Sequence, residues 1–340
     1  MLLQNWHDFL SFLSSLMSII SNKIRIGTRT SKLALAQVAE IHLLLGDHLG
    51  STKIEIIPIT TSGDKIQDRN LADIGGKGLF IKELEEALIQ NKIDIAIHSA
   101  KDVPPILHQD TILAAFSKRF DARDCFISKK FDSLDELPQG AIIGTSSARR
   151  KAILLRLRPD LKIVNFRGNV DTRLKKIEND EVDATILAVC GLERLGKERI
   201  LFENKIACPK GYETKKIIEK NVMLPSGGQG SLVIQSRKSD QKIIDLLAKI
   251  NDAETEICIK TERAFLLELG ASCATPVAVH AWLEDDKLNL KTMILDYDGS
   301  EIFETNSAGK FDLEAGIKLG VEAARKTKEE AAKLLEKICK

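Results

Sequence analysis

The chain has 340 residues, of which 44% are hydrophobic and 29% are charged, and its formal net charge is +1. This length accommodates two or three soluble domains, and the small net charge excludes a global field that would favour nucleic acid or an anionic membrane. The six cysteines include no CxxC pair, and no Cys/His cluster has the spacing of a zinc site. We therefore expect a cytoplasmic protein with reduced thiols and without a metal, a nucleic-acid partner or a membrane partner.

Residues 1–22 differ in character from the rest of the chain. Apolar residues from Trp6 to Ile20 follow helical spacing, but polar residues interrupt them, so the segment is a poor membrane span. No Lys or Arg precedes Lys23, so the basic region of a secretory or transit peptide is also missing. We treat the segment as an extension outside the folded core without a catalytic role, with Met17 as a second candidate start. An amphipathic docking helix is the alternative.

The first two thirds of the chain contain a weak internal repeat. A strand at 23–26 leads through Gly27–Ser31 into a helix at 32–45, and a strand at 141–143 leads through Gly144–Ser147 into a second helix. Each unit then ends with a helical stretch and an apolar strand. These pairs are 79–90 with 93–98, and 170–179 with 182–187. The pattern is typical of βαβ units with parallel strands and predicts two similar α/β lobes facing each other.

The remaining segments indicate how the lobes are joined and which domain comes after them. A less regular stretch after Ile200 leads into the glycine-rich turn Pro225–Gly230, which we interpret as a crossover back into the first lobe. The last part shows a helix, a loop with Cys273, three strands and a final helix at 313–337, as in an α+β domain. The predicted units are the extension 1–22, lobe 1 at 23–117 and 226–248, lobe 2 at 118–225, and a C-terminal domain at 252–340.

Two loops of the repeat are suited to binding an anion. In open α/β sheets ligands sit at the carboxyl ends of strands, where helix N-termini present free N–H groups and a positive dipole end. The loops Thr28–Ser31 and Thr145–Ser147 occupy such positions, so together they would hold a multiply anionic small molecule across a cleft. The simpler interpretation is that these hydroxyl residues only cap helices, and capping is compatible with binding.

Several basic residues fall in loops or at helix starts rather than along helix faces. Arginine matches carboxylates and phosphates with two parallel hydrogen bonds, so their recurrence after predicted strands favours a shared anion site. Each one alone is more simply a solvated charge. The segment Gly75–Gly78 lacks the spacing of a phosphate-binding P-loop. The basic candidates are Arg29, Lys77, Lys101, Arg149, Arg150, Arg167, Arg173 and Arg194.

Asp102 and Cys273 are the two candidates for chemistry. Asp102 follows an apolar strand and precedes two prolines, which hold the chain extended. A carboxylate fixed there is suited to stabilise a developing cation or to donate a proton, and the alternative is a turn aspartate paired with Lys101. Cys273 stands on a loop of small residues after Gly270, which is placed as a helix C-cap. The alternative for this thiol is inert packing.

Short motifs occur in a fixed order between Ile24 and the C-terminus. They are IGTRTSKLA (26–34), GGKGLF (75–80), HSAKDVP (98–104), GTSSARR (144–150), RGNVDTRL (167–174), GLERLG (191–196), GQG (228–230) and ERAF (262–265), followed by Cys273. This set resembles the hydroxymethylbilane synthase family, also called porphobilinogen deaminase. The chain departs from the family pattern in three places: 198–224 looks longer, Ala271–Ser272 stands where glycine is common, and 1–22 has no counterpart.

The resemblance implies two periplasmic-binding-protein-like α/β lobes around a cleft and a C-terminal α+β domain. Cys273 would carry a dipyrromethane cofactor through a thioether. Four porphobilinogen units would be added in turn with loss of ammonia, and water would release hydroxymethylbilane for porphyrin and haem biosynthesis. Asp102 would stabilise the azafulvene-like cations formed on deamination and assist proton transfer. The residues that would hold acetate and propionate groups are Arg29, Ser31, Lys77, Lys101, Thr145, Ser146, Ser147, Arg149, Arg150, Arg167, Arg173, Arg194 and Gln229.

Two other functions compete with this interpretation. The main alternative is a non-catalytic, two-lobed binding protein for an anionic solute, and a weaker one is a regulatory module that senses an anionic ligand. Neither has a use for a cofactor thiol, so a covalent pyrrole adduct separates the enzyme from both. For the enzyme we expect porphobilinogen as substrate, a monomeric state and hand-over of the product to the next pathway enzyme.

Overall fold

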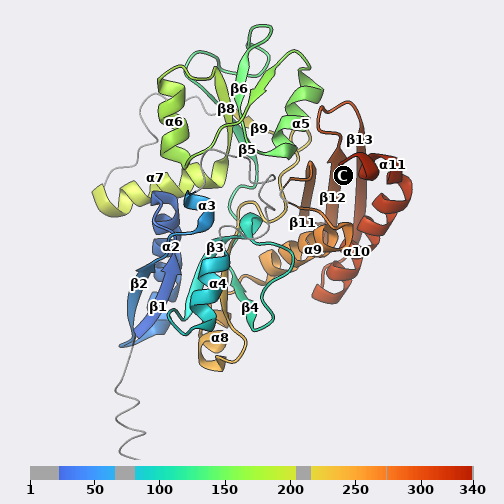
Figure 1. The fold of residues 1–340 in the computed structure, drawn as a ribbon. Helices are drawn as coiled ribbons and strands as arrows, with labels where there is room; N and C mark the ends of the chain where they lie inside the picture. Colours follow the sequence, from blue (N-terminus) through green and yellow to red (C-terminus); the bar gives the residue numbers. More distant parts are fainter. Residues whose placement is uncertain (1–22, 66–80, 204–215, 273, 339–340) are drawn as a thin grey trace, which may run out of the picture.

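The computed structural model describes residues 23–65, 81–203, 216–272 and 274–338. Three of the predictions therefore lie outside the described residues: those for the extension 1–22, for Lys77 and for Cys273. Within the described part, no helix combines the length and the apolar character needed to cross a membrane. Figure 1 shows two α/β lobes, in blue and in green, and an orange-to-red C-terminal domain whose apolar side chains pack against both.

Lobe 1 is a five-stranded sheet with helices packed on it. Its strands are β1 (Lys23–Thr28), β2 (Lys53–Pro58), β3 (Ile95–Ser99), β4 (Thr111–Phe116) and β10 (Leu232–Arg237), and its helices are α2 (Lys32–Leu49), α3 (Ser62–Lys65), α4 (Lys82–Ile89) and α8 (Gln241–Ala248). The strand order is β2-β1-β3-β10-β4. β1 is parallel to β2 and β3, whereas β10 is antiparallel to β3 and β4. Ile41 and Leu45 of α2 share a core with Ile26 and Ile234 of the sheet.

Lobe 2 repeats this arrangement. Its strands are β5 (Asp124–Ser128), β6 (Ile142–Gly144), β7 (Lys162–Val164), β8 (Ala184–Ala188) and β9 (Lys216–Ile218), and its helices are α5 (Ala148–Leu157), α6 (Val170–Glu178) and α7 (Val189–Glu203). The order β7-β6-β8-β5-β9 matches the first sheet position by position. β6 is parallel to β7 and β8, and β5 is antiparallel to β8 and β9. The predicted internal repeat is confirmed.

One strand in each sheet runs against the others, which the prediction of parallel units did not include. The chain crosses from β4 into β5 and later returns into β10. Each crossing segment reaches its new sheet at the side where the parallel strands have their carboxyl ends. The strand that follows starts from that side, so it runs antiparallel to its neighbours. The two crossing segments, 117–123 and 224–231, lie side by side: Arg119 Nε donates to the Gln229 carbonyl at 2.8 Å.

The C-terminal domain contains an antiparallel three-stranded sheet and helices packed on it. Its elements are α9 (Ala253–Leu269), β11 (Val277–Glu284), β12 (Lys287–Leu295), β13 (Ile302–Lys310), α10 (Leu313–Glu330) and α11 (Ala332–Ile338). Phe265 of α9 and Ala324 of α10 share a core with Val279 of the sheet. The final helix predicted over 313–337 is divided at Ala331. The predicted fold class of two α/β lobes and an α+β domain is confirmed, and the exact domain boundaries stay a prediction.

One buried carboxylate joins the C-terminal domain to both crossing segments. Glu262 of α9 accepts hydrogen bonds from Gly228 N at 2.6 Å and from Ala281 N at 2.7 Å. It also forms an ion pair with Arg119, with 2.7 Å between Oε1 and Nη1, and its side chain is fully buried. Burial alone would raise the pKa of the Glu262 carboxyl, but Arg119 and then His280 outweigh burial and lower the pKa to about 2.

Removing this carboxylate should weaken the junction of the three units. For Glu262→Ala we expect the free energy of unfolding to fall by about 3–5 kcal/mol, because the buried Arg119 loses its partner. Chemical denaturation measures this loss. The matched control is Glu268→Ala on the same helix, which removes a partly exposed carboxylate paired with Arg325 and Lys328 and should cost less than about 1 kcal/mol. Equal losses in the two variants would contradict the role given to Glu262.

Candidate active site

The candidate site lies where the strands of both sheets end and the lobes meet. Asp102 follows β3 and belongs to the short 3₁₀ turn η2 (Ala100–Asp102). In lobe 2, β6 ends at Gly144 and the chain turns into α5. Lys32 Nζ in the first turn of α2 is 3.6 Å from Asp171 Oδ2 in the first turn of α6. The carboxyl ends of the two sheets therefore face each other.

One hydroxyl residue in each of the two predicted loops caps a helix. Ser31 Oγ and Ser147 Oγ accept hydrogen bonds from the N–H groups three residues further on, at 3.2 and 3.4 Å. Thr145 is buried and its Oγ1 accepts from Ser147 N at 3.2 Å, whereas Ser146 is exposed and hydrogen-bonds to Asn165. A cap satisfies only part of the N–H groups that a helix leaves free at its start, so capping and anion binding remain compatible.

Asp102 is exposed, and no hydrogen bond or ion pair to another described residue holds its carboxylate. Its neighbour Lys101 is directed elsewhere, because Lys101 Nζ donates to Gln229 Oε1 at 3.1 Å. The alternative of a turn aspartate paired with Lys101 is therefore wrong. Burial lowers the pKa of the Lys101 ammonium; the Cys190 thiol opposes this shift, and the Arg150 guanidinium adds to it.

Arginines of lobe 2 bring positive charge to the space around Asp102. Arg173 of α6 is half-buried, and its Nε donates to the Gly168 carbonyl at 3.0 Å. Burial lowers the pKa of Arg173 to about 10; Arg150 and Arg167 add to the shift, and Asp102 opposes it. Burial also lowers the pKa of Arg167. The structure thus brings the predicted carboxylate of lobe 1 together with predicted cations of lobe 2.

Arg29 adds a cation from lobe 1. It follows β1 and is half-buried. Burial lowers the pKa of His98 in the neighbouring strand β3 to about 4; Gln235 opposes this shift and Arg29 adds to it. Arg29 therefore lies close to the strand that leads into Asp102.

Arg149 and Arg150 lie behind this surface. They are 4% and 7% exposed, and each donates from Nη2 to the carboxylate of Asp124 at 2.7 Å. Their Nη1 atoms donate to the carbonyls of Leu224 and Ile186. Burial would raise the pKa of Asp124, but both arginines outweigh it and hold the pKa well below its usual range. Asp124 was not among the predicted site residues. The only feature of the sequence that could have indicated it is its position as an acidic residue at the start of an apolar strand.

Gln229 connects this buried cluster to Lys101. Its side chain is 1% exposed, and its Nε2 donates to Asp124 Oδ1 at 2.9 Å while its Oε1 accepts from Lys101. Gly228, directly before it, has a φ of +80°, and a Cβ there would lie 2.7 Å from backbone atoms of Ala100 and Lys101. The returning crossing segment therefore supports the 3₁₀ turn through a side chain and through close backbone packing.

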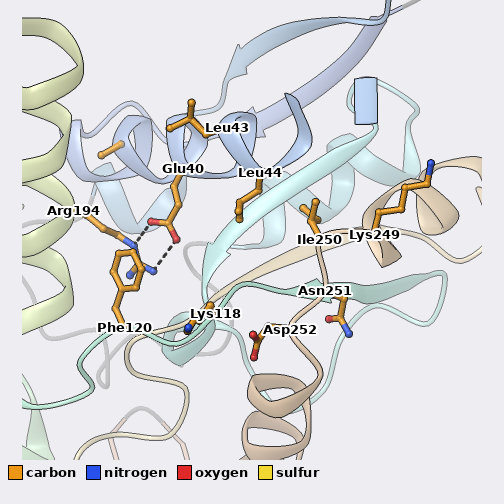
Figure 2. Close-up of a pocket in the computed structure, with 11 residues that line it drawn as sticks. Glu40, Leu43, Leu44, Lys118, Phe120, Arg194, Lys249, Ile250, Asn251 and Asp252 are labelled. Carbon is orange, nitrogen blue, oxygen red and sulfur yellow. Dashed lines mark hydrogen bonds and ion pairs between the residues drawn. The ribbon is translucent and has the colours of Figure 1, made fainter. Parts of the chain in front are cut away.

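Arg194 joins the two lobes outside this cluster. Its Nε lies 2.9 Å from Glu40 Oε2 of α2, and its Nη2 donates to the Gly230 carbonyl at 3.0 Å. The guanidinium is buried and stands over the Phe120 ring at 4.6 Å. Figure 2 shows this ion pair beside a cavity of about 520 Å³ whose apolar wall includes Leu43. Arg194 thus ties α7 to α2 and to a crossing segment.

Cys273 lies outside the described residues, but both flanks of its loop are described. α9 ends at Gly270, whose φ of +77° is the predicted left-handed C-cap. Ser272 N donates to Thr275 Oγ1 at 3.0 Å, and Ala274 N donates to Ser272 Oγ at 3.2 Å. These hydrogen bonds join described residues on the two sides of Cys273.

Comparison with protein families gives two matches along the chain. The family model described as porphobilinogen deaminase, dipyromethane cofactor binding domain, matches residues 24–245, and that of the porphobilinogen deaminase C-terminal domain matches 256–329. This chain belongs to the porphobilinogen deaminase family. Similar curated relatives are named porphobilinogen deaminase. That of Nitrobacter hamburgensis is 45% identical over 90% of this chain and 93% of the relative. That of Orientia tsutsugamushi is 47% identical over 89% of this chain and 97% of the relative.

Solved structures that match part of the chain include that of the methionine-binding protein MetQ. The match covers 67% of this chain and 88% of the MetQ chain, with a TM-score of 0.41 and 15% sequence identity. A score this low supports no argument about fold or function, so the fold class rests on the sheet topology described above.

The described residues near Asp102 fit the dipyrromethane cofactor that the matching family model names. Each pyrrole ring carries two carboxylates and a ring N–H, so the group requires several cations and an acceptor beside its nitrogens. Lys101 and Arg173 interact with the charge of Asp102, Arg167 interacts with Arg173, and Arg29 interacts with His98 of β3. The chemistry of the donor set therefore matches the group.

A methyl group added at Gly228 tests the support of the 3₁₀ turn. For Gly228→Ala we expect a loss of about 2–5 kcal/mol, because strain at positive φ adds to overlap with backbone that cannot rotate away. Gly270→Ala is the matched control, since its φ is similar and a Cβ there meets no atom within 4 Å; it should lose about 1–2 kcal/mol. Urea unfolding measures both, and similar losses would show that the contact with Ala100 and Lys101 does not matter.

Proposed function

We propose that this member of the porphobilinogen deaminase family is a hydroxymethylbilane synthase, a transferase of tetrapyrrole biosynthesis. It joins four porphobilinogen molecules in turn with loss of ammonia and releases linear hydroxymethylbilane by hydrolysis. The family matches over both lobes and the C-terminal domain support this function. The observation that carries it is the exposed Asp102 carboxylate, which lies among cations and has no hydrogen-bond or ion-pair partner within the described ranges.

Cys273 is the proposed attachment point of the cofactor, through a thioether. In the sequence it stands between α9 and β11, among the small residues Ala271, Ser272 and Ala274. Cys125, Cys190 and Cys258 are buried, which makes them poor attachment points. When bound, the dipyrromethane supplies the pyrrole ring to which the first substrate unit is joined.

Asp102 is the proposed catalytic residue. Loss of ammonia from the substrate leaves positive charge on its pyrrole portion, and a fixed carboxylate stabilises such charge as it develops. The same carboxylate oxygens are suited to hold and return a proton during the step. An ion pair with Lys101 would cancel this charge, so the hydrogen bond from Lys101 to Gln229 keeps Asp102 available.

The predicted carboxylate-binding residues fall into two groups. The residues proposed to bind acetate and propionate groups directly are Arg29, Ser31, Lys77, Lys101, Ser146, Ser147, Arg167 and Arg173. The residues with buried side chains, proposed to support that surface, are Thr145, Arg149, Arg150, Arg194 and Gln229. Two carboxylates on every pyrrole explain why so many cations are gathered around a single acid.

The two competing functions explain less of the chain. A solute-binding protein or a ligand-sensing module requires two lobes and a cleft, but it has no use for the C-terminal domain that the family match includes at 256–329. We also propose that the enzyme acts in the cytoplasm as a monomer and passes its product to the next enzyme of the pathway. Cys190 and Cys258 are free thiols among the described residues, which supports a reducing compartment.

Intact mass is the direct test of this function. The purified chain should carry extra mass equal to two condensed pyrrole units, and Cys273→Ala should lack it because the thioether cannot form. Cys258→Ala, which removes a buried thiol in the same domain, should keep the extra mass. An unmodified wild-type chain, even after incubation with porphobilinogen, would favour solute binding instead.

Replacing Asp102 should affect rate and leave stability unchanged. For Asp102→Asn we expect kcat to fall by about 10²–10⁴-fold, the usual contribution of a general acid or base. The free energy of unfolding should stay within about 0.5 kcal/mol, because the side chain is exposed. Product formation and chemical denaturation measure the two effects, with Asp47→Asn on the exposed face of α2 as the control. A kcat within twofold of the control would remove Asp102 from the mechanism.

A further inference from the structure

The guanidinium group of Arg263 in α9 holds the chain segment that follows Asp102. Its Nη1 donates to the Val103 carbonyl at 3.0 Å, and its Nη2 donates to the carbonyls of Pro104 at 2.7 Å and Pro105 at 3.1 Å. One side chain of the C-terminal domain therefore binds three successive carbonyl groups of lobe 1. The nearest of them is one residue away from the proposed catalytic carboxylate.

The charge of Arg263 has no carboxylate partner in the described part of the chain. Arg119 and Arg149, two other arginines with little exposed side chain, are paired with acids, whereas burial alone lowers the pKa of Arg263 to about 10. A partly desolvated cation without an anion is costly, so hydrogen bonds to neutral groups are needed to offset that cost. The carbonyls of Val103, Pro104 and Pro105 supply these three acceptors.

A second contact from the same helix reinforces the first. Ile259 lies one turn before Arg263 on α9, is fully buried, and shares an apolar cluster with Ala100 and Val103. Ala100 and Val103 flank the Lys101–Asp102 dipeptide on both sides. α9 therefore contacts the chain on either side of Asp102, with an apolar residue and with a charged one.

The same helix leads to the loop of the cofactor. From Arg263, α9 continues to Leu269, a distance of about 9 Å at 1.5 Å per residue. Gly270 then ends the helix, and Cys273 follows three residues later in the sequence. A single rigid element thus carries the contacts to the Asp102 segment at one point and the loop of Cys273 at its end.

We propose that Arg263 is a positioning residue that clamps Val103–Pro105 to α9 and so fixes the Asp102 carboxylate relative to the loop of Cys273. This inference rests on the roles given to Asp102 and Cys273 in the proposed function. Arg263 touches neither substrate nor cofactor, and it acts through the backbone that it holds. Its contribution is geometric, because misplacement of a reacting group by about 1 Å reduces a rate by about 10²-fold.

The test compares three variants of the full-length protein. Arg263→Met keeps the apolar stem and removes every donor, and Arg263→Lys keeps the charge and part of the donor capacity. Arg156→Met is the matched control, since Arg156 of α5 also donates to a carbonyl across a domain boundary, that of Gly299 at 3.3 Å, far along the chain from Asp102. Hydrogen exchange of the backbone amides at 101–103 and 106–107 measures how firmly Arg263 holds the segment. The values of kcat and KM measure catalysis, and intact mass measures cofactor content.

For Arg263→Met we expect amide exchange in these stretches to be about 10- to 100-fold faster, which is the effect of losing hydrogen bonds to a charged donor. We expect kcat to fall about 100-fold, with KM within about twofold and a full cofactor mass. Arg263→Lys should recover part of both effects, and Arg156→Met should show neither.

Wild-type exchange rates at 101–103 and 106–107 in Arg263→Met would overturn the proposal. A fall in kcat no larger than that of Arg156→Met would overturn it as well. Failure of the proposed function looks different, because the wild-type protein itself would then carry no pyrrole mass and consume no porphobilinogen. The exchange measurement would still decide whether Arg263 holds the segment.

Discussion

The buried carboxylate of Glu262 is the constraint on which the arrangement of the three units depends. It meets the N–H of Gly228 in one crossing segment, the guanidinium of Arg119 in the other, and the N–H of Ala281 in β11. A carboxylate removed from water is stable only when such donors surround it. The two crossing segments and the C-terminal domain must therefore assemble together, and polar contacts specify their relative placement in addition to apolar packing.

A second buried carboxylate, that of Asp124, extends this polar network toward the candidate site. Asp124 is held by two arginines and by Gln229, and Gln229 in turn accepts the hydrogen bond of Lys101. Lys101, the cation next to Asp102 in the sequence, is thereby directed toward the protein interior. The hydrogen bond to Gln229 directs the Lys101 ammonium away from the Asp102 carboxylate, and no other described residue forms a hydrogen bond or ion pair with that carboxylate.

The features of the site that depend on neighbours in the sequence were predictable. The caps at Ser31 and Ser147, the C-cap at Gly270 and the position of Asp102 after an apolar strand are of this kind. Hydrophobic periodicity and turn chemistry say which residues are buried, but they do not say which distant residue each one meets. Arg149 was for that reason placed at the cleft surface. The pairs that escaped prediction are Arg119–Glu262, Arg194–Glu40, Arg149–Asp124 and Lys101–Gln229.

The correspondence between the two lobes stops directly after strands β3 and β8. Gly27 of β1 pairs with Ala96 of β3 as Gly144 of β6 pairs with Thr185 of β8, but the chain then enters the 3₁₀ turn η2 in lobe 1 and the helix α7 in lobe 2. The duplicated scaffold thus brings two matching sets of strand ends together and places different local structure after them. A repeated framework that ends differently in its two halves presents unlike chemical groups on its two facing sides.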